Sequence, residues 1–209
     1  MKNHTDPLYH KYKNIHEVNA LNPTEKHELI SRSFRLIMET MGLNLEDDSL
    51  RGTPNRVAKM FLREVFWGLS PYNFPRITTV LNKFEYDQML VEKKIDVKSF
   101  CEHHFVPIIG HAHVAYIPKK KVIGLSKINR IVDYYARRPQ IQERLTQQIM
   151  ECLQIILDTQ DVAVTIDVAH YCVRMRGIQH NESETRTTAL GGSFKTCPHT
   201  RTEYFNSLN

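Results

Sequence analysis

The amino-acid sequence predicts an α+β fold, in which an antiparallel four-stranded sheet carries helices on one face and follows an N-terminal helical part. Apolar residues recur at helical spacing as far as residue 68, and from residue 93 onward they alternate with polar residues as in strands. Two predicted strands then precede a pair of helices, and two more strands follow it. This order favours an antiparallel sheet. We therefore expect a helical region at residues 1–92 and a sheet domain at residues 93–209.

Two helices are predicted in the N-terminal part. The first begins at Asn22-Pro23-Thr24-Glu25, a capping box with proline at the first helical position, and ends at Gly42, which suits a left-handed cap. Its apolar face consists of Ile30, Phe34, Ile37 and Met41. The second helix begins at Thr53-Pro54, another pair of capping residue and proline, and ends at Gly68. Its apolar face consists of Val57, Met60, Phe61 and Val65.

Four strands and two helices are predicted after residue 92. The strands cover Lys93–Phe100, Phe105–Ile117, Asp161–Arg176 and Thr185–Phe194, with a turn at Pro118 and the three lysines that follow it. Between the second and third strands, Ser126 is expected to cap a short helix and Pro139 to open a longer one. Cys152 lies on the apolar stripe of the longer helix, which favours a buried structural cysteine. The segment after Phe194 is expected to be a mobile tail.

The composition is that of an ordinary globular protein. Of the 209 residues, 41% are hydrophobic and 24% charged, which excludes a disordered chain, and no apolar run is long enough for a membrane span. Residues 1–14 lack the apolar stretch of a secretory signal, so a cytoplasmic protein is expected, in which cysteine near histidine indicates a metal or a reactive thiol. The net charge of +5 favours an anionic partner, but its scattered charges do not favour nucleic acid.

Two clusters of cysteine and histidine indicate a metal site. Cys101 and His104 have the Cys-x-x-His spacing that lets a thiolate and an imidazole reach one zinc ion from a tight turn. Along the strand predicted over Asp161–Arg176, side chains two residues apart share a face, and this face changes from apolar to reactive at His170 and Cys172. Either residue supplies a third ligand, unless a bulge in the strand reassigns it.

Three protein ligands with an open fourth position are typical of a catalytic zinc. Cys197 or His199 would close the coordination sphere and make the zinc structural, but both lie in the predicted tail. A catalytic zinc lowers the pKa of its bound water to about 7. His103 and His170 would then lie beside that water as proton carriers, with a packing role as the alternative for each.

Several basic residues are candidates for binding an anionic partner. The sequence has no glycine-rich phosphate loop of the Walker type, so a bound nucleotide must be held by separate side chains. Candidate cations are Arg56, Lys127, Arg130 and Arg176, although such residues are more often solvated surface charges. Gln142-Glu143 offers an amide and a carboxylate, which suits the N1 and N2 donors of a guanine edge. The same pair is also common on a solvated helix face.

These residues lie in five motifs that together resemble GTP cyclohydrolase I, a zinc enzyme that catalyses the first step of folate and pterin synthesis. The resemblance extends from Thr53 to Arg201. The motifs are Cys101-Glu102-His103-His104-Phe105, Ala115-Tyr116-Ile117-Pro118, Gly124-Leu125-Ser126-Lys127-Ile128-Asn129-Arg130, Arg138-Pro139-Gln140-Ile141-Gln142-Glu143-Arg144-Leu145, and His170-Tyr171-Cys172 followed by Arg176-Gly177.

The resemblance implies a tunnelling-fold catalytic domain at residues 93–209 and a toroidal homodecamer with active sites at subunit interfaces. It implies zinc on Cys101, His104 and Cys172. The other implied roles are proton transfer for His103 and His170, assistance to the ribose steps for Ser126, contact with the guanine edge for Gln142 and Glu143, and triphosphate binding for Lys127, Arg130, Arg176 and Arg56.

The reaction implied by the resemblance begins with attack of water on C8 of GTP, opens the imidazole ring and releases C8 as formate. Rearrangement of the ribose and ring closure then give 7,8-dihydroneopterin triphosphate. His111 departs from the family, which more usually has lysine there, and it alters the local charge or offers a stray metal contact. Structural roles are favoured for both His111 and His113, which share one face of the predicted strand.

Two alternative functions stay open. A basic, zinc-stabilised nucleic-acid-binding module has only the +5 charge and the cysteine and histidine content as support, and it predicts salt-dependent binding to DNA or RNA. A tunnelling-fold nitrile reductase would use a nucleophilic cysteine and a nicotinamide cofactor. Stoichiometric zinc on Cys101 and Cys172 argues against that reductase, because a ligated thiolate is not a free nucleophile.

Overall fold

The computed structural model describes residues 6–12 and 21–208. Of the segment 1–14, where no secretory signal is expected, residues 1–5 and 13–14 lie outside this part. The helices are α1 (Pro23–Thr40), α2 (Thr53–Met60), α3 (Leu125–Ala136), α4 (Gln142–Leu157), α5 (Tyr171–Arg174), α6 (Gly192–Thr196) and α7 (Pro198–Ser207). The strands are β1 (Thr79–Leu81), β2 (Leu90–Cys101), β3 (Pro107–Tyr116), β4 (Lys121–Ile123), β5 (Pro139–Gln140), β6 (Val162–His170) and β7 (Thr185–Leu190).

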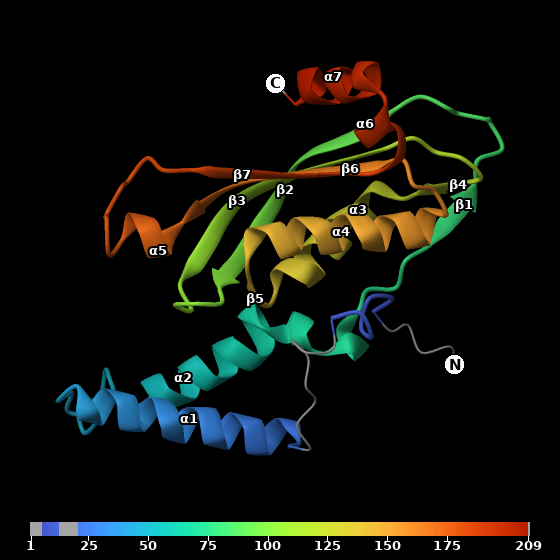
Figure 1. The fold of residues 1–209 in the computed structure, drawn as a ribbon. Coiled ribbons are helices and arrows are strands. Elements are labelled where there is room, and N and C mark those ends of the chain that lie inside the picture. Colours follow the sequence, from blue (N-terminus) through green and yellow to red (C-terminus); the bar gives the residue numbers. More distant parts are fainter. Residues whose placement is uncertain (1–5, 13–20, 209) are drawn as a thin grey trace.

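Layers of helices lie on both sides of a curved sheet (Figure 1). The sheet has the order β5-β2-β3-β6-β7, and its four long strands are antiparallel, as predicted. The predicted α+β class is therefore confirmed. Two additions were not expected: the two-residue β5 pairs in parallel with β2, and β1 pairs with β4 where the lysines after Pro118 predicted only a turn. The division of the chain at residue 92 stays a prediction. Strand β2 begins at Leu90, slightly before this boundary.

The start of α1 follows the predicted capping box. The Asn22 side chain accepts hydrogen bonds from the backbone N–H groups of Thr24 and Glu25, and the Glu25 carboxylate accepts one from the Asn22 N–H at 2.7 Å. Gly42 has φ +81°, as its capping role requires. The predicted apolar face of α1 is only partly covered, because Ile37 and Met41 are half or more exposed.

The second N-terminal helix is interrupted. The α-helical part, α2, ends at Met60, and the chain goes on as a π-helical turn over Phe61–Val65. Short 3-10 helices follow. The N-cap of α2 is Gly52 rather than the predicted Thr53. The helical unit ends at Val65, and Gly68 lies within the 3-10 helix Trp67–Leu69 rather than at the predicted end. A Cβ atom at Gly68 would lie 2.2 Å from the Tyr134 carbonyl oxygen. The close approach of these backbones explains the glycine.

Helices α3 and α4 cover one face of the sheet and bury the main core. On β6, Val164, Ile166 and Val168 point into this core, as the alternation predicted, and Cys152 on α4 is fully buried there. Two predicted helix starts were wrong. Gly124 rather than Ser126 is the N-cap of α3. Pro139 does not open α4, because it lies in β5, which pairs with β2 before α4 begins at Gln142.

The opposite face of the sheet, on which no helix was predicted, is covered by α6 and α7, so the predicted mobile tail was wrong. The fully buried Tyr204 packs with Phe194, Ala115 and Ala163. Its hydroxyl donates to the Thr165 Oγ1 at 2.8 Å. Strand β7 therefore ends at Leu190 instead of the predicted Phe194, because the chain must turn at the following glycines to cover this face.

Candidate metal centre and active site

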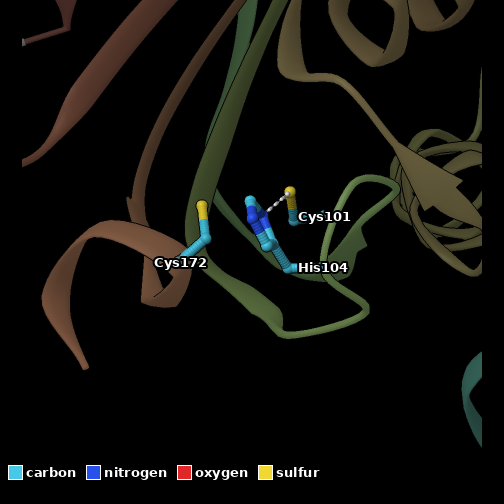
Figure 2. Close-up of side chains that lie close together, drawn as sticks. All are labelled: Cys101, His104 and Cys172. Carbon is cyan, nitrogen blue, oxygen red and sulfur yellow. Dashed lines mark hydrogen bonds between the residues drawn. The ribbon is translucent and has the colours of Figure 1, made fainter. Parts of the chain in front are cut away.

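Three potential metal ligands meet at one end of the sheet. Cys101 is the last residue of β2, His104 lies in the turn that follows, and Cys172 lies on α5. Their ligand atoms all lie within 4.8 Å of one another, and residues 6–12 and 21–208 contain no other such group of three. Figure 2 shows the His104 ring between the two sulfur atoms. The sequence-predicted ligands are therefore close together.

The turn between β2 and β3 brings Cys101 and His104 to the same side. The Cys101 N–H donates to the Val106 carbonyl and the Phe105 N–H donates to the Cys101 carbonyl, both at 2.8 Å. Phe105 has φ +52°, a conformation uncommon for a residue with a side chain. Its ring packs against Phe66 at a centroid separation of 5.5 Å, which anchors the turn to the N-terminal helices.

Cys172 reaches the group by a different route from the one predicted. Strand β6 ends at His170, where its pairing with Ile108 near the start of β3 also ends, and the chain turns into α5. The alternation therefore holds as far as His170 and is wrong for Cys172, Arg174 and Arg176. A single helical turn, rather than a strand face, places the Cys172 thiol beside Cys101.

The donor set of the three residues fits zinc. Two sulfur donors and one imidazole are a set that this ion accepts, with one position left open. Burial raises the pKa of the Cys172 thiol, and the neighbouring Cys101 thiol raises it further. A divalent cation would favour the thiolate forms and offset both effects. The alternative ligands His170, Cys197 and His199 do not belong to the group of three.

His170 is oriented by Gln142. Its Nε2 atom lies 2.8 Å from the Gln142 Oε1 atom. The Gln142 amide donates its two hydrogens to the carbonyls of Ile166 and Thr185, each at 2.9 Å, so Oε1 must be the acceptor toward His170. Nε2 of His170 therefore carries a proton, and Nδ1 is left as an acceptor. Burial lowers the pKa of His170, and the nearby Glu143 carboxylate raises it to a smaller extent.

Two further predicted site residues contact the ligands, and a third, Glu143, lies near His170. The Nδ1 atom of His103 lies 3.8 Å from the Cys101 sulfur. Arg176 is exposed and its guanidinium donates to the Nε2 atom of His104 at 2.9 Å. Glu143 is exposed at the start of α4, directly after the buried Gln142. An imidazole and a cation thus lie beside the ligands, and an exposed carboxylate lies near His170.

The other predicted site residues are not joined to this group within the described part of the chain. Ser126, Lys127 and Arg130 lie in the first turns of α3, and none of them makes a hydrogen bond or ion pair to the ligands. Arg56, on α2, donates instead to the Ser49 carbonyl at 2.9 Å. One chain by itself therefore does not gather all of the predicted cations.

His111 and His113 lie away from the ligand group, along β3. His111 Nδ1 lies 3.6 Å from an Asp96 oxygen. His113 is buried, its Nε2 lies 3.7 Å from an Asp167 oxygen, and burial lowers its pKa. These contacts join neighbouring strands, which agrees with the structural roles expected for both histidines.

Sequence reasoning missed an ion pair beside the metal ligands. Arg144, in the first turn of α4, pairs with Glu102, which lies between Cys101 and His103. Both residues are part of the quoted motifs, but nothing in their spacing indicated a contact. Only the pairing of β5 with β2 brings the two segments together.

Comparisons with known proteins show the family to which the chain belongs. The family model described as GTP cyclohydrolase I matches residues 30–209. The chain is 56% identical over 190 residues to the GTP cyclohydrolase 1 of Aeromonas salmonicida, covering 91% of this chain and 87% of that protein. It is 54% identical to the GTP cyclohydrolase 1 of Vibrio cholerae, with 91% and 88% covered, and 56% identical to that of Flavobacterium johnsoniae, with 88% and 82% covered.

A solved structure gives a weaker likeness. The apo crystal structure of an archaeosine synthase QueF-Like has a TM-score of 0.40 and 22% identity, and it covers 48% of this chain and 90% of that chain. That likeness carries no functional argument. Among the described residues, no helix combines the length and the apolar character needed to cross a membrane. The family model and the relatives, however, span nearly the whole chain at more than half identity, and the chain therefore belongs to the GTP cyclohydrolase I family.

Proposed function

We propose that this protein is a zinc-dependent GTP cyclohydrolase that converts GTP and water to 7,8-dihydroneopterin triphosphate and formate. The observation that carries the proposal is the Cys101, His104 and Cys172 group, whose ligand atoms lie within 4.8 Å. His103 approaches the Cys101 sulfur, and His170 precedes Cys172 by two residues, so both are candidates to move protons there. Membership of the family supports GTP as the substrate.

Cys101, His104 and Cys172 would hold the zinc ion. Zinc with three protein ligands supplies Lewis acidity and lowers the pKa of water in its open position to about 7. The chain's own contribution to proton movement is His170, whose Nε2–H is held by Gln142 so that Nδ1 can accept a proton. His103, 3.8 Å from the Cys101 sulfur, is the second proton carrier.

Substrate binding would use the exposed groups around the ligands. Glu143 presents a carboxylate that can accept hydrogen bonds from N1 and N2 of guanine. The resemblance also assigned Gln142 to the guanine edge, but both of its amide hydrogens are donated to the carbonyls of Ile166 and Thr185. We therefore propose that Gln142 mainly orients His170. Arg176 would bind the triphosphate, since a guanidinium suits phosphate oxygens.

We also propose that the active site is completed in a homodecamer. The remaining triphosphate cations, Lys127, Arg130 and Arg56, make no contact with the metal ligands within the described chain, so they would act from a neighbouring subunit, together with Ser126. Large apolar side chains are exposed on separate surfaces, and patches of this kind mark contacts between proteins. They include Leu36 and Ile37 on α1, Met41 directly after it, Val80 and Leu81 on β1, and Phe84, which is 96% exposed.

A turnover assay tests the proposal directly. Purified protein loaded with zinc is incubated with GTP, and we expect formate release together with a product that fluoresces as a pterin after oxidation. A chelator should abolish both signals, and added zinc should restore them. Absence of both signals in zinc-replete protein would overturn the proposal, and salt-dependent binding of DNA or RNA in that case would favour the nucleic-acid module. Cytoplasmic localisation stays a prediction from the sequence.

A further inference from the structure

The Arg144 side chain connects three segments beside the metal ligands. Its guanidinium pairs with the Glu102 carboxylate, donates to the Gln140 Oε1 at 2.9 Å and donates to the Pro139 carbonyl at 3.2 Å. The side chain is only 15% exposed, whereas that of Glu102 is 31% exposed. An arginine with three partners in a mostly buried place is well ordered, since its planar fork fixes several hydrogen bonds at once.

Helix stability does not explain why a cation occupies this position. Arg144 lies in the first turn of α4, where the helix dipole favours acidic side chains and disfavours a positive charge. The sequence therefore breaks a local rule here, and such departures are expected where a residue serves a site. The compensating contact is the carboxylate of Glu102, which comes from a different segment of the chain.

Glu102 lies inside the ligand turn, between the metal ligands Cys101 and His104. Its N–H donates to the Gln140 carbonyl at 3.1 Å, and Cys101 is the pairing partner of Gln140. The turn is thus attached to β5 through its backbone and to α4 through the Arg144 guanidinium. The same first turn of α4 carries Gln142, which orients His170 at 2.8 Å. One helix end therefore contacts both the ligand turn and the proposed proton carrier.

We propose that Arg144 is a positioning residue, which acts through Glu102 to hold the Cys101–His104 turn in the arrangement that binds zinc. Without the guanidinium, only the pairing with β5 would connect this turn to α4, and the distance between the Cys101 and His104 donors would vary more. Partners of this kind, outside the ligands themselves, typically change metal affinity or activity about 10- to 100-fold when they are removed. The inference rests on the zinc site of the proposed function.

The test compares Arg144→Met, Arg144→Lys and Glu102→Gln in the full-length, assembled protein. Zinc affinity is measured by competition with a chelator of known affinity, without GTP, and kcat and KM for GTP are then measured at saturating zinc. For Arg144→Met we expect zinc binding about 10- to 100-fold weaker and a lower kcat, with KM changed less than about threefold. Arg144→Lys should lie between it and the wild type, because lysine keeps the charge but not the fork.

Arg186→Met is the matched control. Arg186 likewise pairs with a carboxylate, in its case through two nitrogens at 2.6 and 3.1 Å from the Asp167 oxygens, but it is exposed on β7 and has no contact with the ligand turn among the described residues. The zinc affinity and kcat of the Arg186→Met variant should stay within about twofold of the wild type, since exposed ion pairs contribute little to stability. A loss of zinc in this control equal to that of Arg144→Met would overturn the proposal, because the effect would then be general.

The double variant Glu102→Gln/Arg144→Met separates the two roles further. If Arg144 acts through Glu102, the double variant should bind zinc about as weakly as the single Arg144→Met variant. Fully additive losses, or wild-type zinc affinity in both single variants, would overturn the inference. If Arg144→Met does not fold, the Glu102→Gln variant tests the proposal in its place: weaker zinc binding supports it, and wild-type zinc affinity overturns it. Failure of the proposed function is distinct, because the wild-type protein itself would then bind no stoichiometric zinc or release no formate.

Discussion

Replacing Gln142 with methionine separates two roles that this residue can have. Methionine is similar in length but offers neither the Oε1 acceptor nor the amide donors. If Gln142 orients His170, the substitution removes the hydrogen bond of 2.8 Å at His170 Nε2. If Gln142 instead recognises guanine, as the resemblance implied, the substitution removes a contact with the substrate. The two cases change different kinetic constants.

The size of the effect follows from the hydrogen bond. When His170 takes up a proton, its bond to Gln142 becomes charge-assisted, and such bonds contribute about 1.5–3 kcal/mol. At about 1.4 kcal/mol per tenfold change, kcat should fall roughly 10- to 150-fold with KM for GTP little changed. The carbonyls of Ile166 and Thr185 also lose a donor, so the free energy of unfolding should fall by about 1–3 kcal/mol or more.

The assay is steady-state formate release at saturating zinc, with zinc content and urea unfolding measured on the same samples. Gln147→Met is the control, because it makes the same substitution on α4 at a side chain whose one hydrogen bond, among residues 6–12 and 21–208, is to Glu151 at 2.9 Å. Its kcat and KM should match the wild type. A rise in KM of more than about tenfold for Gln142→Met, with kcat unchanged, would refute the orienting role and support guanine recognition.

Three other substitutions test the ligand set and the packing. Cys172→Ala should lose zinc and turnover together, as measured by metal analysis and formate release, and full zinc retention would move the third ligand elsewhere. Tyr204→Ala should lower the free energy of unfolding by about 3–5 kcal/mol in urea titrations, because the ring is fully buried and its hydroxyl bonds Thr165; an unchanged value would mean that α7 does not stabilise the fold. Asp6→Ala should cost up to about 3–5 kcal/mol, because it breaks an ion pair with Arg138 in which both side chains are 1% exposed; a cost below about 1 kcal/mol would mean that the 6–12 segment detaches easily.

Local features were predictable from the sequence. The capping box at Asn22 and the left-handed Gly42 depend on neighbours within a few residues, and both are confirmed. The alternation along β6 predicted its buried face as far as His170 for the same reason. Cys101 and His104 are three residues apart in one turn, so their spacing was sufficient to predict that they meet. These features need no knowledge of the rest of the chain.

Contacts between distant segments were decided only by the tertiary structure. The alternation could not show that β6 loses its partner strand at His170, so the route of Cys172 to the ligand group was wrong although its membership was right. The low apolar content after Phe194 concealed an ordered helix, because Tyr204 is the single buried residue of α7. The Glu102–Arg144 pair depends on the register of β5 against β2. Spacing in the sequence determines which groups a short segment presents, but strand register and helix docking determine which distant groups come within bonding distance, because they depend on the packing of the whole chain.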